Sequence, residues 1–273
     1  MHKVEIIAEA GVSHNGDLAT ALKLCDAAKE ARADIVKFQT YVPEKALAVN
    51  SKHFPLLKSL ALPLIAFQKI SDHCRNINIE FMSTPDDLDS LNFLVKECGV
   101  KRIKIGSGSL TYKPLVDAAY KTGKPVILST GMATCEEIER ALPHDGGYVP
   151  ITLMHCVSLY PCPFEEANLK AIHTLRKFGY PVGYSDHTTS KESVPVMAVA
   201  AGATIIEKHF TLDRMQKGPD HHMSLSPVEF AWFVNAIREA EAIYGSGNKT
   251  PSIDEAAMIP RIRKNSDGVQ PGL

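Results

Sequence analysis

Long apolar runs, paired cysteines and a leader pattern are all missing from this sequence. No stretch approaches the roughly 20 apolar residues that a membrane-crossing helix needs. The first residues, MHKVEIIAEAGVSHNG, hold too short an apolar run for a secretory signal and no cleavage-site pattern. The 6 cysteines show no CxxC spacing, which favours reduced, partly buried thiols over a disulfide framework. We therefore expect a cytoplasmic protein with no membrane partner.

An excess of either charge is also absent. The chain has 30 Lys and Arg against 31 Asp and Glu, so the sequence offers neither a basic nucleic-acid footprint nor an acidic tail. A GxGxxG pattern does not follow the first strand-like run, which argues against a dinucleotide site. The composition, 45% hydrophobic and 22% charged, is that of a globular protein with ample core.

What the sequence does have is alternation between β-rich runs and helical patterns. Eight runs read as strands, at 4–10, 34–40, 79–85, 102–108, 125–131, 150–156, 181–187 and 203–210. Helical patterns lie at 17–32, 63–76, 86–98, 112–122, 134–142, 165–178, 190–201 and 226–244. Such alternation predicts right-handed βαβ units and a parallel sheet. Eight units fit an α/β fold of the closed (β/α)8 TIM-barrel type better than an open doubly wound sheet.

We predict a single barrel domain over residues 1–245. Within it, 41–62 is a longer excursion that would carry an extra helix or a flap. Residues 246–273 are rich in Gly, Ser, Pro and Asn, which is typical of a C-terminal tail or a linker remnant. A second folded domain is not expected.

Polar residues gather at the C-terminal ends of the predicted strands, where a barrel has its mouth and its chemistry. They are Glu9, Lys37, Gln39, Ser83, Thr84, Lys104, Ser107, Ser129, Thr130, His155, Ser185, Asp186, His187, Glu207, Lys208 and His209. Strand interiors are mostly apolar. The pattern therefore predicts one ring of functional groups.

Lys37 and Lys104 have apolar neighbours on both sides, in VKF and IKI. A lone lysine near a strand end is usually solvated or ion-paired, but a buried ammonium without an anion is costly, so each needs a partner. The hydroxyl residues of GSGS (106–109) and STG (129–131) would singly serve as helix caps. Beside lysines, hydroxyls and glycine-flanked N–H groups form a site for phosphate or carboxylate. Together they favour an anionic substrate.

His187 and His209 end successive predicted strands. Adjacent strands lie about 4.8 Å apart, so two imidazoles there can converge on one ion, although an isolated histidine is more often structural. Hard ligands nearby, such as Asp220 and Glu9, would suit manganese or magnesium better than a closed zinc site. The loop KGPDHHMS (217–224) is open to two interpretations, a histidine cluster for a metal or a polar loop facing the substrate.

Glu9 lies in a run predicted to be a buried strand and is followed by small residues. A carboxylate in such a place needs a partner or a chemical role. We expect general acid or base work from it.

Nine motifs in this order resemble the barrel of the N-acetylneuraminate (sialic acid) synthase family. They are AEAGVSHNG, VKFQT, FMSTP, IKIGSGS, ILSTGM, HCVSLYPCP, GYSDHT, IEKHF and GPDHHMS, from about residue 5 to about residue 245. The resemblance implies a transferase that condenses phosphoenolpyruvate with the open-chain aldehyde of an N-acetylated hexosamine such as N-acetylmannosamine. The products would be a nine-carbon 2-keto acid and phosphate.

The resemblance also implies roles for individual residues. Phosphoenolpyruvate would be bound by Lys37, Thr84, Lys104, Ser107, Ser129 and Ser185, and the sugar side would include Gln39, Tyr160 and Asp220. Glu9 would be the acid/base group, and His187 and His209 would bind a catalytic divalent ion, Mn2+ before Mg2+ or Co2+. A homodimer is compatible with the family.

Three departures from the family pattern fall on the sugar side. Ser109 stands at the position of a sugar-contacting glutamate, and Ser158 stands where an asparagine is usual. Typical members continue into a C-terminal antifreeze-like domain that gives an arginine to the partner's sugar site, and this arginine is not expected in a chain ending at Leu273. We therefore expect a retained donor site, while the identity of the acceptor stays open between an N-acetylated hexosamine and another sugar or aldehyde.

Three alternatives stay open at this point. The first is a phosphoenolpyruvate-dependent synthase that acts on another aldehyde. A second is a non-catalytic barrel that binds a sugar phosphate, and a third is a barrel excised from a longer protein.

Overall fold

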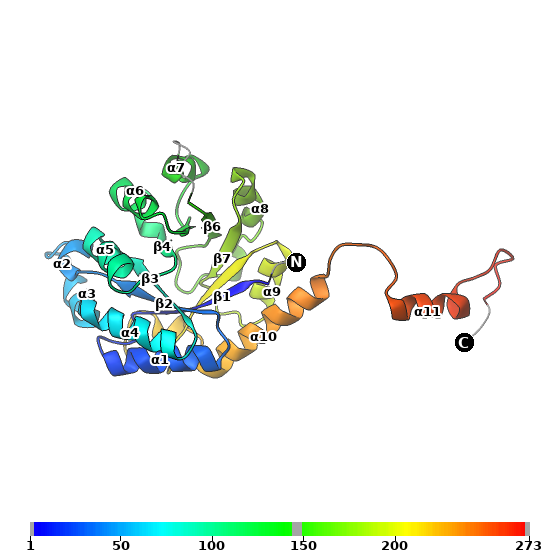
Figure 1. The fold of residues 1–273 in the computed structure, drawn as a ribbon, viewed down its shortest axis with the longest axis horizontal. Helices are drawn as coiled ribbons and strands as arrows, with labels where there is room; N and C mark the ends of the chain where they lie inside the picture. Colours follow the sequence, from blue (N-terminus) through cyan, green and yellow to red (C-terminus); the bar gives the residue numbers. More distant parts are fainter. Residues whose placement is uncertain (1–2, 144–148, 271–273) are drawn as a thin grey trace. The chain divides into compact units, whose positions relative to one another are not determined.

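The computed structural model describes residues 3–143 and 149–270, and eight parallel strands form its centre (Figure 1). They are β1 (Glu5–Gly11), β2 (Ile35–Thr40), β3 (Glu80–Pro85), β4 (Ile103–Ile105), β5 (Val126–Ser129), β6 (Ile151–His155), β7 (Val182–Asp186) and β8 (Ile205–His209). Their hydrogen-bonded order is β3-β2-β1-β8-β7-β6-β5-β4, and the two end strands, β3 and β4, contact each other. The sheet therefore curls into a nearly closed TIM barrel, which confirms the predicted fold class.

Helices cover the outside of the barrel (Figure 1). They are α1 (Leu18–Glu30), α2 (Pro43–Ala46), α3 (Phe54–Leu60), α4 (Leu64–Asn76), α5 (Leu88–Lys96), α6 (Lys113–Lys121), α7 (Cys135–Ala141), α8 (Ala171–Leu175), α9 (Ser193–Ala200) and α10 (Pro227–Tyr244). The side chain of Asp17 caps α1 by accepting the N–H groups of Ala19 and Thr20, as its position in the sequence predicts. Thr134 and Glu137 form a capping box that starts α7.

Two segments show in detail what the sequence left open or predicted differently. The excursion at 41–62 contains the helices α2 and α3, so of the two alternatives given for it the extra helix is confirmed. The helix expected at 165–178 is divided, because short 3-10 turns at Phe164–Glu166 and Arg176–Phe178 flank α8. Asn168 has a φ of 42°, in the left-handed region that a continuous helix cannot contain, so it ends the first turn.

Side chains inside the barrel are stacked in layers, because alternate residues of each strand point inward. At the N-terminal end, Arg102 lies between Glu5 and Glu80. One layer further in is an apolar cluster made of Ile7, Ile35, Met82, Ile127, Met154 and Ile205. The residues that point outward join a second, larger core against the helices. Any inward-pointing side chain beyond the apolar layer must therefore lie near the mouth.

Gly183 shows how closely two strands approach in this interior. A Cβ atom on Gly183 would lie 2.7 Å from the carbonyl oxygen of Ile205 on β8. Any larger residue would push β7 away from β8, and these are the strands that end in the predicted histidine pair. Glycine is thus a steric requirement for their convergence.

Residues 244–270 belong to a second unit of the chain. It contains one further helix, α11 (Ile253–Ile262), which the sequence reading of 246–273 as a tail did not anticipate. The side chain of Ser252 caps α11 by accepting the N–H of Glu255, a local signal that lies in the sequence itself. The domain boundary at 245 stays a prediction.

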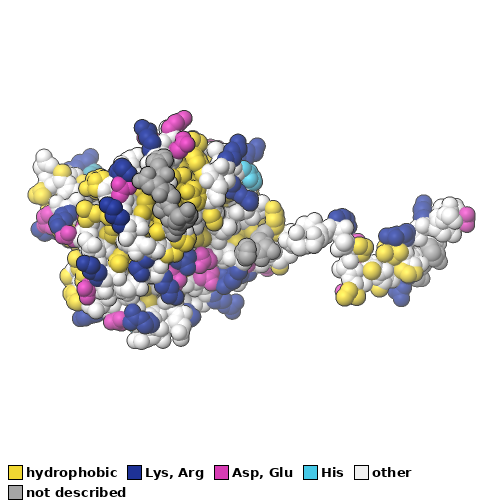
Figure 2. Space-filling model, turned by 45° about the horizontal axis from the view of Figure 1, so that its top comes forward, with side chains coloured by type: hydrophobic (Ala, Val, Ile, Leu, Met, Phe, Trp, Pro, Cys, Tyr) yellow, Lys and Arg dark blue, Asp and Glu magenta, His cyan; other side chains and the backbone are white. Residues whose placement is uncertain are grey.

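Charges of both signs are interspersed on the face of the molecule drawn in Figure 2. In the described part of the chain, we find no helix with the length and apolar character needed to cross a membrane.

Arg102 provides a test of the layer at the N-terminal end of the barrel. Its guanidinium donates to Glu5 at 2.7 and 2.8 Å and to Glu80 at 2.8 Å, and all three side chains are partly buried. Arg102→Met leaves both carboxylates without their shared partner, so we expect a loss of about 2 kcal/mol in urea denaturation. Arg75→Met removes an exposed pair with Asp72 and should leave the transition midpoint unchanged. Equal effects of the two substitutions would refute the special role of Arg102.

Candidate active site

A cavity of about 280 Å³ opens at the C-terminal ends of the strands. All the predicted site residues line it except Ser109 and Asp220. The predicted residues on its wall are Glu9, Lys37, Gln39, Thr84, Lys104, Ser107, Ser129, Ser158, Tyr160, Ser185, His187 and His209. It is also lined by Gly106 and Gly108 of the GSGS motif, by Glu207, which the sequence placed in the ring without an individual role, and by three residues that the sequence did not single out, Asp86, Met132 and Cys156. Residues far apart in the chain thus share one site.

The prediction that all polar strand-end residues form one ring around the mouth is wrong for those that point outward from the barrel. Ser83, Thr130, His155, Asp186 and Lys208 bond to groups outside the cavity and do not line it. The Nζ of Lys208 donates to Asp186 at 2.8 Å, so these two charges neutralise each other on the far side of the strands. The reason is the alternation of side chains along a strand, since each outward residue directly adjoins an inward one.

Two buried lysines and two buried glutamates form the centre of the site. The Nζ of Lys37 lies 2.7 Å from Oε2 of Glu9 and 3.5 Å from Oε2 of Glu207. The Nζ of Lys104 lies 3.2 Å from both carboxylate oxygens of Glu207. All four side chains are almost fully buried. Each lysine thus has the anionic partner that its burial requires, and Glu207 is shared by both.

The pKa values in this cluster move in opposite directions. Burial raises the pKa of Glu9 to about 7, although Lys37 opposes the shift. Burial would also raise the pKa of Glu207, but Lys104 and Lys37 outweigh it and hold that pKa below its ordinary value. Two carboxyl groups with divergent pKa values can take different roles, one exchanging protons and one remaining ionised.

Hydroxyl groups line the same cavity beside this cluster. The Oγ of Ser107 accepts the N–H of Gly131 at 3.1 Å, and the Oγ of Ser185 donates to Glu207 at 2.9 Å. A helix-capping role, the alternative for the serines, is not observed, because α7 is capped by Thr134 and the side chain of Tyr112, before α6, makes no capping bond. The hydroxyls of Ser107 and Ser185 instead bond to other groups of the cavity wall, where they also line the space open to a ligand.

His187 and His209 converge in the wall of the cavity, with ring centroids 5.6 Å apart. Burial lowers the pKa of His187 and, together with the neighbouring His187 ring, holds the pKa of His209 well below its ordinary value. Both rings are thus neutral near pH 7 and can offer nitrogen lone pairs to a metal. The Nδ1 of His187 bonds to the carbonyl oxygen of Val157, an arrangement common among metal-binding histidines. The Nδ1 of His209 is buried and has no hydrogen-bond partner among residues 3–143 and 149–270.

These observations fit a metal site built on two imidazoles. Among the described residues, no group of three or more His, Cys, Asp or Glu side chains is already arranged around one point for a metal. The remaining ligands would therefore come from water or substrate oxygens. That composition is typical of an open, catalytic site rather than a closed structural one.

The 217–224 loop lies next to this pair. The carboxylate of Asp220 is 3.9 Å from Nδ1 of His209. The ring nitrogens of His221 lie 2.7 Å from the hydroxyl of Thr211 and 3.3 Å from the side-chain oxygen of Asn15, so that histidine anchors the loop. Of the two interpretations of the loop, a cluster of metal-binding histidines is thereby disfavoured.

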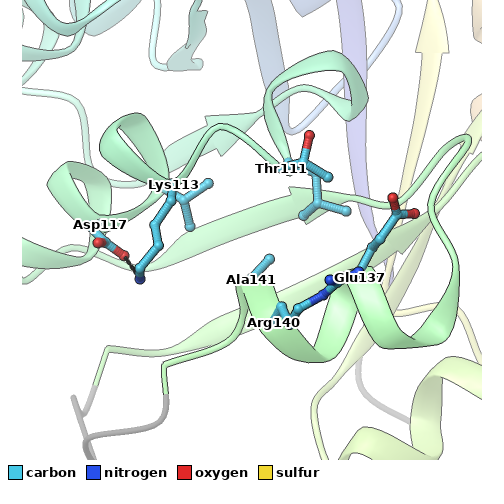
Figure 3. Close-up of a pocket in the computed structure, with 8 residues that line it drawn as sticks. Thr111, Lys113, Asp117, Glu137, Arg140 and Ala141 are labelled. Carbon is cyan, nitrogen blue, oxygen red and sulfur yellow. Dashed lines mark hydrogen bonds and ion pairs between the residues drawn. The ribbon is translucent and has the colours of Figure 1, made fainter.

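A cavity on the outside of the barrel, of about 350 Å³, lacks such features. It lies between α6 and α7 and is lined by Leu110, Thr111, Lys113, Val116, Asp117, Glu137, Arg140 and Ala141. Figure 3 shows Lys113 turned to Asp117, and their 2.8 Å ion pair is mostly exposed. Lysines in the mouth are buried and face a polar cavity, whereas this one is solvated.

Fold and site together define a (β/α)8 barrel whose mouth holds two buried lysines, two buried glutamates and a histidine pair. The NeuB family description matches residues 24–249. The chain is 42% identical to the N,N'-diacetyllegionaminic acid synthase of Campylobacter jejuni, over 97% of this chain and 84% of that protein. It is 41% identical to the sialic acid synthetase of Leptospira borgpetersenii, solved with citrate, over 94% of this chain and 90% of the other, with a TM-score of 0.89.

The chain therefore belongs to the NeuB family and is a phosphoenolpyruvate-dependent synthase of the nonulosonic-acid type. A phospho-2-dehydro-3-deoxyheptonate aldolase of Thermotoga maritima shares the fold alone, with a TM-score of 0.72 at 17% identity, over 90% of this chain and 72% of the other.

Proposed function

We propose that the enzyme joins phosphoenolpyruvate to the open-chain aldehyde of an N-acetylated hexosamine, N-acetylmannosamine or a related sugar. One observation carries the proposal: Lys37 and Lys104 lie buried with hydroxyl groups in the same cavity as a neutral histidine pair. The products would be a nine-carbon 2-keto acid and phosphate. Relatives named as legionaminic acid and pseudaminic acid synthases support this product class.

The donor would be held by the two lysines and the surrounding hydroxyls. The ammonium groups suit the phosphate and carboxylate of phosphoenolpyruvate, and Thr84, Ser107, Ser129 and Ser185 add hydrogen bonds. Held in this way, the enol carbon would face an aldehyde at the rim, so that two molecules react as if they were one. Residues proposed for the sugar are Gln39, Ser109, Ser158, Tyr160 and Asp220.

Glu9 would move the protons of the reaction. Carbon 3 of phosphoenolpyruvate attacks the aldehyde carbon, water adds to carbon 2, and phosphate leaves with cleavage of its C–O bond. A carboxyl group with a pKa near 7 can both donate and accept a proton at neutral pH, which is the property that these steps need.

His187 and His209 would hold a divalent ion, Mn2+ first among the candidates. The ion would polarise the aldehyde oxygen as a Lewis acid. The two neutral rings and the orphaned Nδ1 of His209 support this assignment. A cytoplasmic location and a homodimer stay predictions.

The reaction is tested by phosphate release. Purified protein with Mn2+ and phosphoenolpyruvate should release phosphate only when an aldehyde is added, and a panel should include N-acetylmannosamine and its 2- and 4-substituted relatives. Mass spectrometry should find a product heavier than the sugar by the three-carbon keto acid. Phosphate release that is independent of every aldehyde would reject the condensation.

Gly131 tests the donor pocket by shape alone. A Cβ atom there would lie 2.4 Å from Oγ of Ser158 and 2.8 Å from Oγ of Ser107, so Gly131→Ala must displace the hydroxyl wall. We expect a fall of at least about 10-fold in phosphoenolpyruvate affinity by calorimetry. Gly108→Ala is the matched control, because a Cβ there meets nothing within 4 Å. Identical affinities for the two variants would remove Ser107 from the donor site.

Metal binding is tested separately from turnover. Mn2+ titration should show binding to the wild type and a loss of at least about 100-fold for His187→Ala or His209→Ala. The exposed His173, replaced by Ala, serves as the control. A preparation stripped by chelator should be inactive and should recover with Mn2+. Full rates in the stripped protein would overturn the metal assignment.

A further inference from the structure

Asp86 lines the cavity but has no role in the proposed binding of the donor or of the metal. It follows the last residue of β3, and its N–H donates to the carbonyl oxygen of Thr40, so it continues the β2–β3 ladder. Alternation along this strand points Met82 into the apolar layer and Thr84 toward Lys37. Asp86 is the next inward position, and it lines the mouth cavity.

The neighbouring carboxylate has a structural role that Asp86 lacks. Asp87 accepts the N–H and hydroxyl of Ser90 and the N–H of Val42, so it caps α5 and fixes the following loop. In the described residues, the side chain of Asp86 makes neither a hydrogen bond nor an ion pair. A half-buried carboxyl group without a partner is costly, and its place in the cavity indicates that a ligand supplies the partner.

Both lysines of the cavity pair with its glutamates, and the proposed function assigns them to the donor. Lys37 is bound to Glu9 and Thr84, and Lys104 is bound to Glu207. Burial raises the pKa of Asp86 to about 7, while Lys37 opposes the shift. Three carboxyl groups face two lysines on the wall, so a second anionic substrate group would meet Asp86 without a cation of its own.

We propose that Asp86 determines acceptor specificity, by accepting a hydrogen bond from a hydroxyl or amide N–H group of the acceptor sugar and disfavouring an anionic group there. This inference rests on the proposed condensation and deepens it. A site built to bond a substrate hydroxyl discriminates strongly against an analogue that leaves the protein group unpaired. A like charge at the same point is disfavoured further. In this proposal Asp86 contacts the acceptor sugar, as is also proposed for Gln39 on the neighbouring strand β2.

The experiment compares Asp86→Ala and Asp86→Asn with Asp89→Asn. Asp89 is an exposed residue of α5 whose carboxylate pairs with Lys45, so it controls for loss of a nearby charge. Steady-state phosphate release is measured with N-acetylmannosamine, with its 6-phosphate and with any better aldehyde of the panel. Unfolding midpoints establish that each variant is folded, and the isosteric Asn variant keeps the proposal testable should the Ala variant unfold.

Asp86→Ala should raise KM for the acceptor at least about 10-fold and leave KM for phosphoenolpyruvate within about 2-fold. The ratio of kcat/KM for the neutral sugar to kcat/KM for its 6-phosphate should be about 10-fold smaller in Asp86→Asn than in the wild type. Asp89→Asn should change neither quantity.

Two results would overturn the assignment while leaving the condensation intact. One is an acceptor KM and a neutral-to-phosphate ratio that both stay within about 2-fold of wild type. The other is a rise in KM for phosphoenolpyruvate equal to that for the acceptor, which would move Asp86 to the donor side. Absence of aldehyde-dependent phosphate release in the wild type would instead reject the proposed function and this inference with it.

Discussion

The sharing of one buried carboxylate, Glu207, between Lys37 and Lys104 is the constraint on which the site depends. Removing an ammonium group from water costs several kcal/mol unless an anion and further hydrogen bonds compensate it. Glu207 lies within 3.5 Å of both ammonium groups, and Ser185 donates to the same carboxylate. Two cations can therefore be held in a closed interior, where their attraction for an incoming anion is weakly screened.

The barrel makes this arrangement possible through its layers. Ile7 and Ile205 fill the interior below, and the next inward residues of the same strands, Glu9 and Glu207, lie above the dry layer. On the outer side, the pair formed by Asp186 and Lys208 is buried against the helices. The charged residues inside the barrel pair with one another, and so do Asp186 and Lys208 outside it. Ion pairs on both faces of the sheet thus hold the C-terminal ends of the strands in place. Stability and chemistry are divided between the two ends of the barrel.

The sequence was sufficient for the fold and for most of the cavity, because β-rich runs and polar strand ends are local signals. The sequence did not show which residues of each strand face the barrel interior and which face the helices. At the end of β6, for example, Cys156 lines the cavity, whereas His155 points outward. The same uncertainty concealed Asp86, although it lies two residues beyond Thr84. Glu207 was placed in the ring of strand-end groups but received no individual role, because its importance arises from contact with Lys37 and Lys104, far away in the chain. Such partners appear only when the register of the strands is known.

Entry of the donor would alter this network in a definite direction. In the proposed binding mode, phosphoenolpyruvate would bring a carboxylate and a phosphate to the lysines, and it would compete with Glu9 for Lys37, which lies 2.7 Å from the Glu9 carboxylate. Since Lys37 is the group that opposes the raised pKa of Glu9, weakening that pair raises the pKa of Glu9 further. The carboxyl group would then take up a proton as the donor binds, whereas Glu207 keeps two cations beside it and remains ionised. Binding of the anion itself would thus place a proton where the condensation needs one.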